Sequence, residues 1–105
     1  MGKNSRSIVW KPTTDETSKK LAGSCEVTAL KLSAGSGAAA VAIYDGVDSD
    51  DAIPNNLRWF LDASTTDNDA QSFDGIVFLK GVFAVCEQGI NFNPVVCMAA
   101  SDYTV

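Results

Sequence analysis

The stretch SFDGIVFLKGVFAVCEQGINFNPVVCM, residues 72–98, decides the fold class of this chain. It contains three short apolar runs, at 76–79, 82–86 and 95–98, and each run ends at Gly, Pro or Asn. Runs of this length with such boundaries are typical of β-strands. Because connections as short as Lys80-Gly81 cannot hold a parallel crossover, the pattern predicts three consecutive strands in an antiparallel meander.

The same kind of pattern extends toward the N-terminus. Residues 24–33 alternate with a phase shift of one residue, which predicts a bulged strand. Residues 39–44 predict a strand with an alanine-lined face, although a short helix competes over 38–42. Leu57, Trp59 and Leu61 alternate with polar or mixed neighbours and predict a strand with those three side chains in the core.

About seven strands at spacings near ten residues, with no convincing helix, predict an all-β fold. The expected architecture is a small antiparallel β-sandwich, jelly-roll or immunoglobulin-like, or a barrel. The polar segments 13–20, 47–56 and 64–71 are predicted to be turns and loops, and 101–105 either a fraying end or a short last strand. A length of 105 residues fits one domain with one core.

We divide the chain into an N-terminal arm, residues 1–20, and a β-sandwich domain, residues 21–105. Within the arm, Ile8-Val9-Trp10 places three large apolar groups next to one another before Pro12, and another surface must cover them. The arm either adds an edge strand to its own domain or inserts into a neighbouring subunit. Ile8, Val9, Trp10 and Lys11 are therefore the predicted contact residues toward another subunit or another protein.

Charge is distributed unevenly along the chain. Residues 1–20 carry five basic and two acidic side chains, a net charge of +3, whereas residues 21–105 carry three basic and eleven acidic ones, a net charge of −8. An acidic body disfavours nucleic-acid binding, because phosphate contacts depend on Lys and Arg. No apolar run approaches the length of a membrane span, and the N-terminus lacks the apolar centre of a signal peptide, so we expect a soluble protein made in the cytoplasm.

Few residues suggest catalysis. The chain has no histidine, which removes the most common general base and metal ligand. Cys25, Cys86 and Cys97 lack zinc-site spacing and are expected to be free thiols, although Cys86 and Cys97 would lie opposite one another in a simple hairpin and could pair there. We expect no enzyme activity, no metal and no cofactor.

The remaining motifs each have a structural interpretation beside a functional one. Asp45-Gly46 and Asp74-Gly75 are turn signals rather than a pair of catalytic carboxylates, and Gly35-x-Gly37 is a hairpin turn rather than a phosphate loop. The acidic residues of the first excursion could bind calcium but lack the EF-hand spacing; they are Asp45, Asp48, Asp50 and Asp51. Four aromatic residues could form a glycan platform, although core placement is favoured for Trp59; they are Trp10, Tyr44, Trp59 and Tyr103.

The order of these features resembles the small β-sandwich structural proteins of tailed bacteriophages. The resemblance spans roughly residues 21–99 and rests on a strand opening Gly23-Ser24-Cys25-Glu26-Val27, a Gly/Ala turn into AVAIYDG at 40–46, a polar loop, FDGI at 73–76 and KGVFAV at 80–85. The chain departs from that group in placing Val82 before Phe83, and in a longer insert around 48–56.

The resemblance implies a virion protein on the capsid surface, most simply a capsid decoration or cement protein. Its implied partners are other copies of itself and the major capsid protein, with no nucleic acid and no membrane. A neck or tail accessory module, or a glycan-binding module on the virion surface, is the alternative that it implies.

Overall fold

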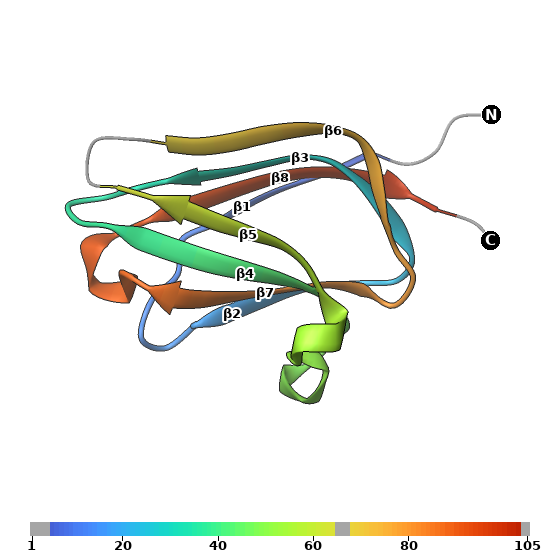
Figure 1. The fold of residues 1–105 in the computed structure, drawn as a ribbon, viewed down its shortest axis with the longest axis horizontal. Helices are drawn as coiled ribbons and strands as arrows, with labels where there is room; N and C mark the ends of the chain where they lie inside the picture. Colours follow the sequence, from blue (N-terminus) through green and yellow to red (C-terminus); the bar gives the residue numbers. More distant parts are fainter. Residues whose placement is uncertain (1–4, 65–67, 104–105) are drawn as a thin grey trace.

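The computed structural model describes residues 5–64 and 68–103, which form eight strands in two four-stranded antiparallel sheets packed face to face (Figure 1). The first sheet has the order β1-β8-β3-β6 and the second has the order β2-β7-β4-β5. The strands are β1 (Ser5–Trp10), β2 (Ser18–Ala22), β3 (Cys25–Ser33), β4 (Ala39–Asp45), β5 (Leu57–Ala63), β6 (Asn68–Phe78), β7 (Gly81–Gln88) and β8 (Val95–Asp102). Three 3-10 turns join them: η1 (Ser49–Asp51), η2 (Pro54–Asn56) and η3 (Ile90–Phe92). The predicted all-β sandwich is confirmed.

Two local predictions are also confirmed. The strand expected over 24–33 is β3, and its register against β6 and β8 shifts between Val27 and Ala29, where the phase of the apolar pattern changes. The alanine-rich residues form β4 and not a helix. The alanines on the outer side of β4, Ala40 and Ala42, are buried.

The predicted meander is wrong, because β6 and β7 belong to different sheets. The chain crosses between the sheets at Lys80-Gly81, where Gly81 has φ +146° and a Cβ would lie 2.5 Å from the carbonyl oxygen of Leu21. The Gly23 amide donates to the Lys80 carbonyl at 3.0 Å, which ties this corner to the turn before β3. A short connection excludes a parallel crossover but does not require its two strands to pair.

Two segments predicted as polar loops contain strands. Residues 18–20 belong to β2, an edge strand that pairs with β7. β6 begins at Asn68 and pairs with β3 at 68–72 and 76–78. Both strands lie at sheet edges, and both segments are largely polar in sequence, so the apolar pattern did not identify them as strands. β8 continues to Asp102, whereas Thr104 and Val105 lie outside the described residues.

Residues 5–22 are part of the sandwich, which corrects the division into an arm and a separate domain. β1 pairs along its whole length with β8, from Ser5 opposite Ser101 to Trp10 opposite Val96. The indole of Trp10 is only 3% exposed and Ile8 packs beside it against the core. Within one chain, the Ile8-Val9-Trp10 trio is therefore part of an edge strand of its own domain, which covers Trp10 and much of Ile8 but leaves Val9 66% exposed.

The core lies between the two sheets. Its largest fully buried side chains come from five strands, β3 to β7, and each contributes about 1.5–3 kcal/mol through burial; they include Val27, Leu30, Leu32, Val41, Ile43, Leu61, Phe78 and Val82. Alternation along each strand sends these side chains inward, so the neighbouring positions form the two outer faces.

Candidate functional site

Asp45 is a buried carboxylate at the end of β4. It accepts hydrogen bonds from the backbone amides of Leu79 and Lys80, at 3.1 and 2.9 Å, and forms an ion pair with Arg58 at 3.8 Å. Both acceptor oxygens therefore hold the corner where the chain passes from β6 to β7. This carboxylate has a structural role and does not face a substrate-sized pocket.

Asp51 orders the excursion between β4 and β5, which Figure 1 shows projecting beyond the second sheet on the side away from the first. Its carboxylate accepts from the Val47 amide at 2.9 Å and lies 3.5 Å from the ammonium of Lys80. The hydrogen bond from Val47 is the main reason that the pKa of Asp51 lies below its usual range, and the charge of Lys80 acts in the same direction.

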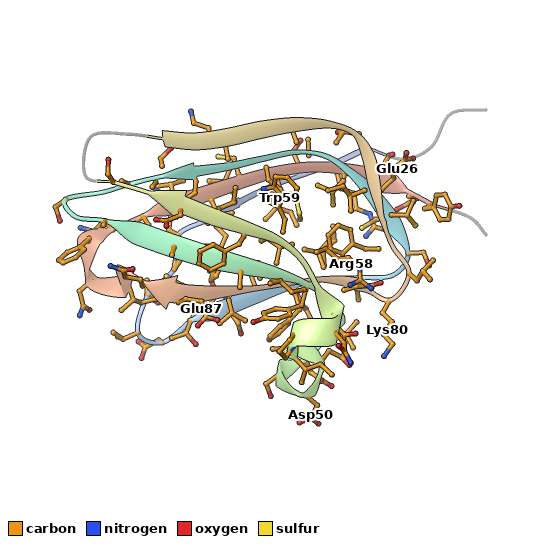
Figure 2. The ribbon with its side chains drawn as sticks, in the orientation of Figure 1. Glu26, Asp50, Arg58, Trp59, Lys80 and Glu87 are labelled. Carbon is orange, nitrogen blue, oxygen red and sulfur yellow. The ribbon has the colours of Figure 1, made fainter. Side chains whose placement is uncertain are left out.

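The carboxylates considered for calcium do not converge. Asp45 faces the β6–β7 corner, Asp48 accepts from the Asp50 amide at 3.0 Å, and Asp51 faces Val47. Figure 2 shows Asp50 at the tip of the excursion, away from the sheets. Across residues 5–64 and 68–103, no three His, Cys, Asp or Glu side chains gather in a way that could hold a metal ion.

The three cysteines are free and lie apart in the fold. Cys86 is opposite Val41 in the second sheet, whereas Cys97 is opposite Val9 and Lys31 in the first. The alternative considered for Cys86 and Cys97, a pairing across a hairpin, does not occur, because β7 and β8 belong to different sheets. Burial raises the pKa of the Cys25 thiol and that of the Cys86 thiol, which favours the unreactive protonated form.

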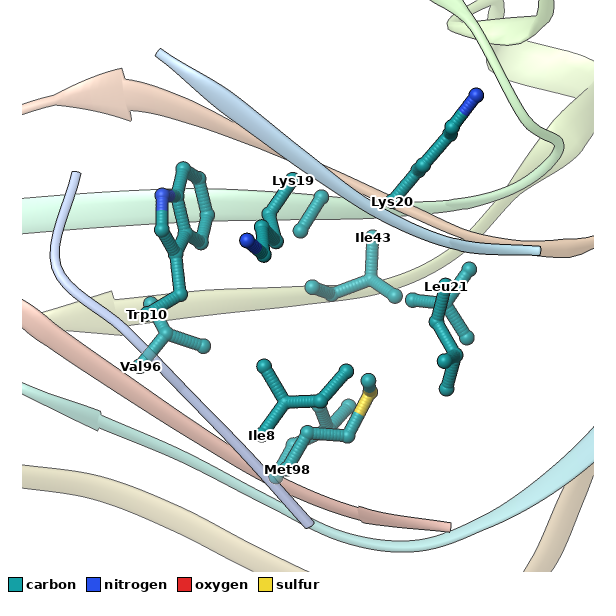
Figure 3. A pocket seen from close by; sticks show the side chains of 11 residues that line it. Ile8, Trp10, Lys19, Lys20, Leu21, Ile43, Val96 and Met98 are labelled. Carbon is teal, nitrogen blue, oxygen red and sulfur yellow. The ribbon is translucent and has the colours of Figure 1, made fainter. Parts of the chain in front are cut away.

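A narrow apolar cavity lies between the edge strands β1 and β2 (Figure 3). Its volume is about 20 Å³, enough for one water molecule and too small for a ligand. Trp10, Ile8 and Leu21 line it, and Figure 3 shows the Lys20 side chain pointing away from it. The cavity is a packing gap at the open edge of the sandwich.

The four aromatic residues considered for a glycan platform are dispersed. Trp10 is in the core, Trp59 is half-buried against it, and Tyr103 lies beyond the end of β8. A β-bulge opposite Tyr44 also changes the predicted face of β5: Leu61 is fully buried, but Leu57 pairs with Tyr44 and is 41% exposed.

A different aromatic group occupies the outer face of the second sheet. Tyr44 of β4 pairs with Phe83 of β7, and Phe60 of β5 pairs with Ala42 of β4. The rings of Tyr44, Phe83 and Phe60 therefore share that face. Phe83 is almost covered and Tyr44 is half-buried, whereas Phe60 is 47% exposed. The sequence contained evidence for this exposed ring. Phe60 is apolar, but the alternation of β5 places its side chain on the side away from the core.

Exposed apolar side chains lie at edge strands on opposite sides of the sandwich. Val9 on β1 is 66% exposed. Leu57 and Phe60 are exposed on β5, at the opposite side of the sandwich. Of the predicted contact residues, Val9 and Lys11 are exposed, Ile8 is half-buried and Trp10 is buried. Only Val9 and Lys11 are thus largely available at the surface of the single chain.

Neither the protein-family models nor the curated proteins include a match to this chain. In the part of the chain that the structure describes, no helix has the length and apolar character needed to cross a bilayer.

Proposed function

We propose that this protein is a structural component of a virus particle, a bacteriophage capsid decoration or cement protein that stabilises the shell by contacts between subunits. One observation carries the proposal: exposed apolar side chains lie on edge strands at both sides of the sandwich, Val9 on β1 and Phe60 on β5. A subunit with contact surfaces on two sides can join neighbours in a closed array. The resemblance of the sequence motifs, in their order along the chain, to phage β-sandwich proteins supports the same role.

The mechanism is burial of apolar surface between neighbours. Each copy contacts another copy and the major capsid protein, so that bound copies stabilise the assembled shell by mass action. The Asp45 carboxylate stabilises the β6–β7 corner by accepting two backbone hydrogen bonds. The role proposed here needs no reactive group.

The test uses purified shells stripped of this protein and then reconstituted with it. We expect the protein to bind the shell surface and to raise the temperature at which the shell releases its contents. Equal thermal stability of stripped and reconstituted shells would rule out cementing, and absence of binding would rule out the capsid as the partner.

A glycan-binding or neck and tail accessory module is the second candidate. Tyr44 and Phe60 favour it, because partly exposed rings on a flat sheet face can stack on sugars. Glycan-dependent retention of the wild-type protein that is lost in Phe60→Ala would support this candidate. Retention unaffected by Phe60→Ala would argue against this face as a sugar site.

A further inference from the structure

A cleft of about 580 Å³ opens to solvent between β2 and the excursion that follows β4. Its volume falls within the range of roughly 300–1,000 Å³ that is typical of small-molecule sites. Ser18 and Lys20 of β2 line one wall, and residues 47–49 of the excursion line the other. We call this site the excursion cleft. None of these residues is among the exposed apolar side chains assigned to shell contacts.

Phe83 forms the floor of the excursion cleft. Its neighbours in β7, Val82 and Ala84, belong to the core, so the alternation of the strand turns the Phe83 ring outward. Lys20 lies directly opposite Phe83 in the pairing of β2 with β7, and Figure 3 shows the Lys20 side chain extending away from the core. The Phe83 ring is only 7% exposed, so it gives the cleft an apolar base with little surface for stacking. A ligand here is therefore held mainly through its polar groups.

Two available charges line the cleft from opposite walls. In the part of the chain that the structure describes, the Lys20 ammonium forms no ion pair. Asp48 uses one carboxylate oxygen to accept from the Asp50 amide at 3.0 Å, and its other oxygen has no partner among the described residues. The remaining two charges at the rim neutralise each other, because the Lys19 ammonium lies 3.8 Å from the Glu16 carboxylate. The cleft thus offers one positive and one negative charge on separate walls.

The wall that carries Asp48 is positioned by the rest of the fold. The Gly46 amide donates to the Gly81 carbonyl at 3.0 Å, which ties the start of the excursion to β7. The Val47 amide donates to the Asp51 carboxylate at 2.9 Å, and Asp48 is the N-cap of η1. These contacts fix the backbone of the wall before a ligand binds, which lowers the cost of ordering the site.

We propose that the excursion cleft binds a small zwitterion, a molecule with an anionic group and an ammonium group on one short scaffold. The Lys20 ammonium donates to the anionic group, and the free Asp48 oxygen accepts from the ligand's ammonium group. A zwitterion pairs both charges at once, whereas a simple anion or a simple cation leaves one of them unpaired. This binding activity is additional to the proposed shell role and does not depend on it.

The first experiment titrates the wild-type protein with phosphoethanolamine and separately with β-alanine, and follows backbone amide shifts by NMR. Because Lys20 and Asp48 are exposed, we expect a dissociation constant on the order of 1 mM, with shifts confined to β2, residues 47–49 and Phe83. Ethanolamine and inorganic phosphate each carry one of the two charges. Each should bind at least about tenfold more weakly than phosphoethanolamine. Added salt should weaken the binding of both zwitterions.

The second experiment removes the two charges one at a time. Lys20→Gln and Asp48→Asn should each weaken binding by about three- to tenfold. Asn is also a good N-cap residue, so the second variant keeps η1 intact. The matched controls are Lys11→Gln and Asp50→Asn, which change exposed charges outside the cleft lining and should leave the affinity within about twofold of wild type. Far-UV circular dichroism should show all four variants folded.

The proposal would be overturned by any of three results. Absence of shifts in β2 and residues 47–49 with both zwitterions excludes the site. Equal binding of inorganic phosphate and phosphoethanolamine, or unchanged affinity in Asp48→Asn, reduces the site to an anion contact at Lys20. Shifts in the cleft with N-acetylglucosamine but with neither zwitterion assign the cleft to a sugar. All three results are obtained without shells, so they leave the test of cementing unaffected.

Discussion

Asp45 is the residue on which the corner between β6 and β7 most depends. We expect Asp45→Ala to lower the free energy of unfolding by about 2–4 kcal/mol, because the Leu79 and Lys80 amides lose their side-chain acceptor. Urea unfolding measures the change. Asp50→Asn at the exposed tip of the excursion is the control and should stay within about 0.5 kcal/mol of wild type. Equal effects of the two variants would show that the corner contact does not stabilise the fold.

Asp51 makes stability depend on pH on the acid side. Its folded-state pKa is lower than the unfolded value, so its stabilisation is fully present above the unfolded pKa and is lost as pH falls through the folded one. The stability difference between wild type and Asp51→Asn should therefore be constant near neutral pH and shrink below about pH 4. Thermal unfolding across pH 2–7 measures this, and a difference independent of pH would contradict it.

Cys25 should be the least reactive thiol of the native protein. It is fully buried in β3, and desolvation raises its pKa, so both access and thiolate formation are limited. Alkylation followed by mass spectrometry should label Cys25 only after unfolding, whereas the half-buried Cys97 reacts in the folded state. Labelling of Cys25 at the same rate as Cys97 would mean that β3 opens in the native protein.

At the scale of elements, β1 is a structural strand as well as an edge. Trp10 and Ile8 cover one side of the core, and we expect Trp10→Ala to cost about 3–5 kcal/mol. Removing residues 1–12 should therefore unfold the domain and cannot by itself report exchange of β1 between subunits. Circular dichroism of the truncated protein checks this. A folded, stable truncated protein would show that β1 is dispensable.

The strands themselves were largely predictable, but their edges were not. Alternation in β3, β4 and β5 identified those strands because their inward side chains are strongly apolar. The pattern missed β2 and the start of β6, because both segments have polar residues at most positions. The outward orientation of the Leu57 side chain was not predictable from the alternation either, because the bulge opposite Tyr44 depends on the pairing of β5 with β4.

At the scale of the whole molecule, the sheets join segments that are distant in the sequence. β8 lies between β1 and β3 in the first sheet, so that the first strand pairs with the last. Folds dominated by such non-local pairs fold in milliseconds to seconds. We expect stopped-flow refolding in that range, and a time constant of microseconds would contradict the topology.

The sequence by itself determined the strand periodicity, the all-β class and the absence of histidine chemistry, because side-chain alternation and composition are local properties. Only the tertiary structure decided which strands pair and that β6 and β7 enter different sheets at Gly81. It also placed the Asp45 carboxylate where it accepts hydrogen bonds from the Leu79 and Lys80 amides. It also decided that residues 5–22 belong to the sandwich and that Phe60 lies on an open edge. These outcomes depend on contacts between residues far apart in the chain, and no local pattern encodes them.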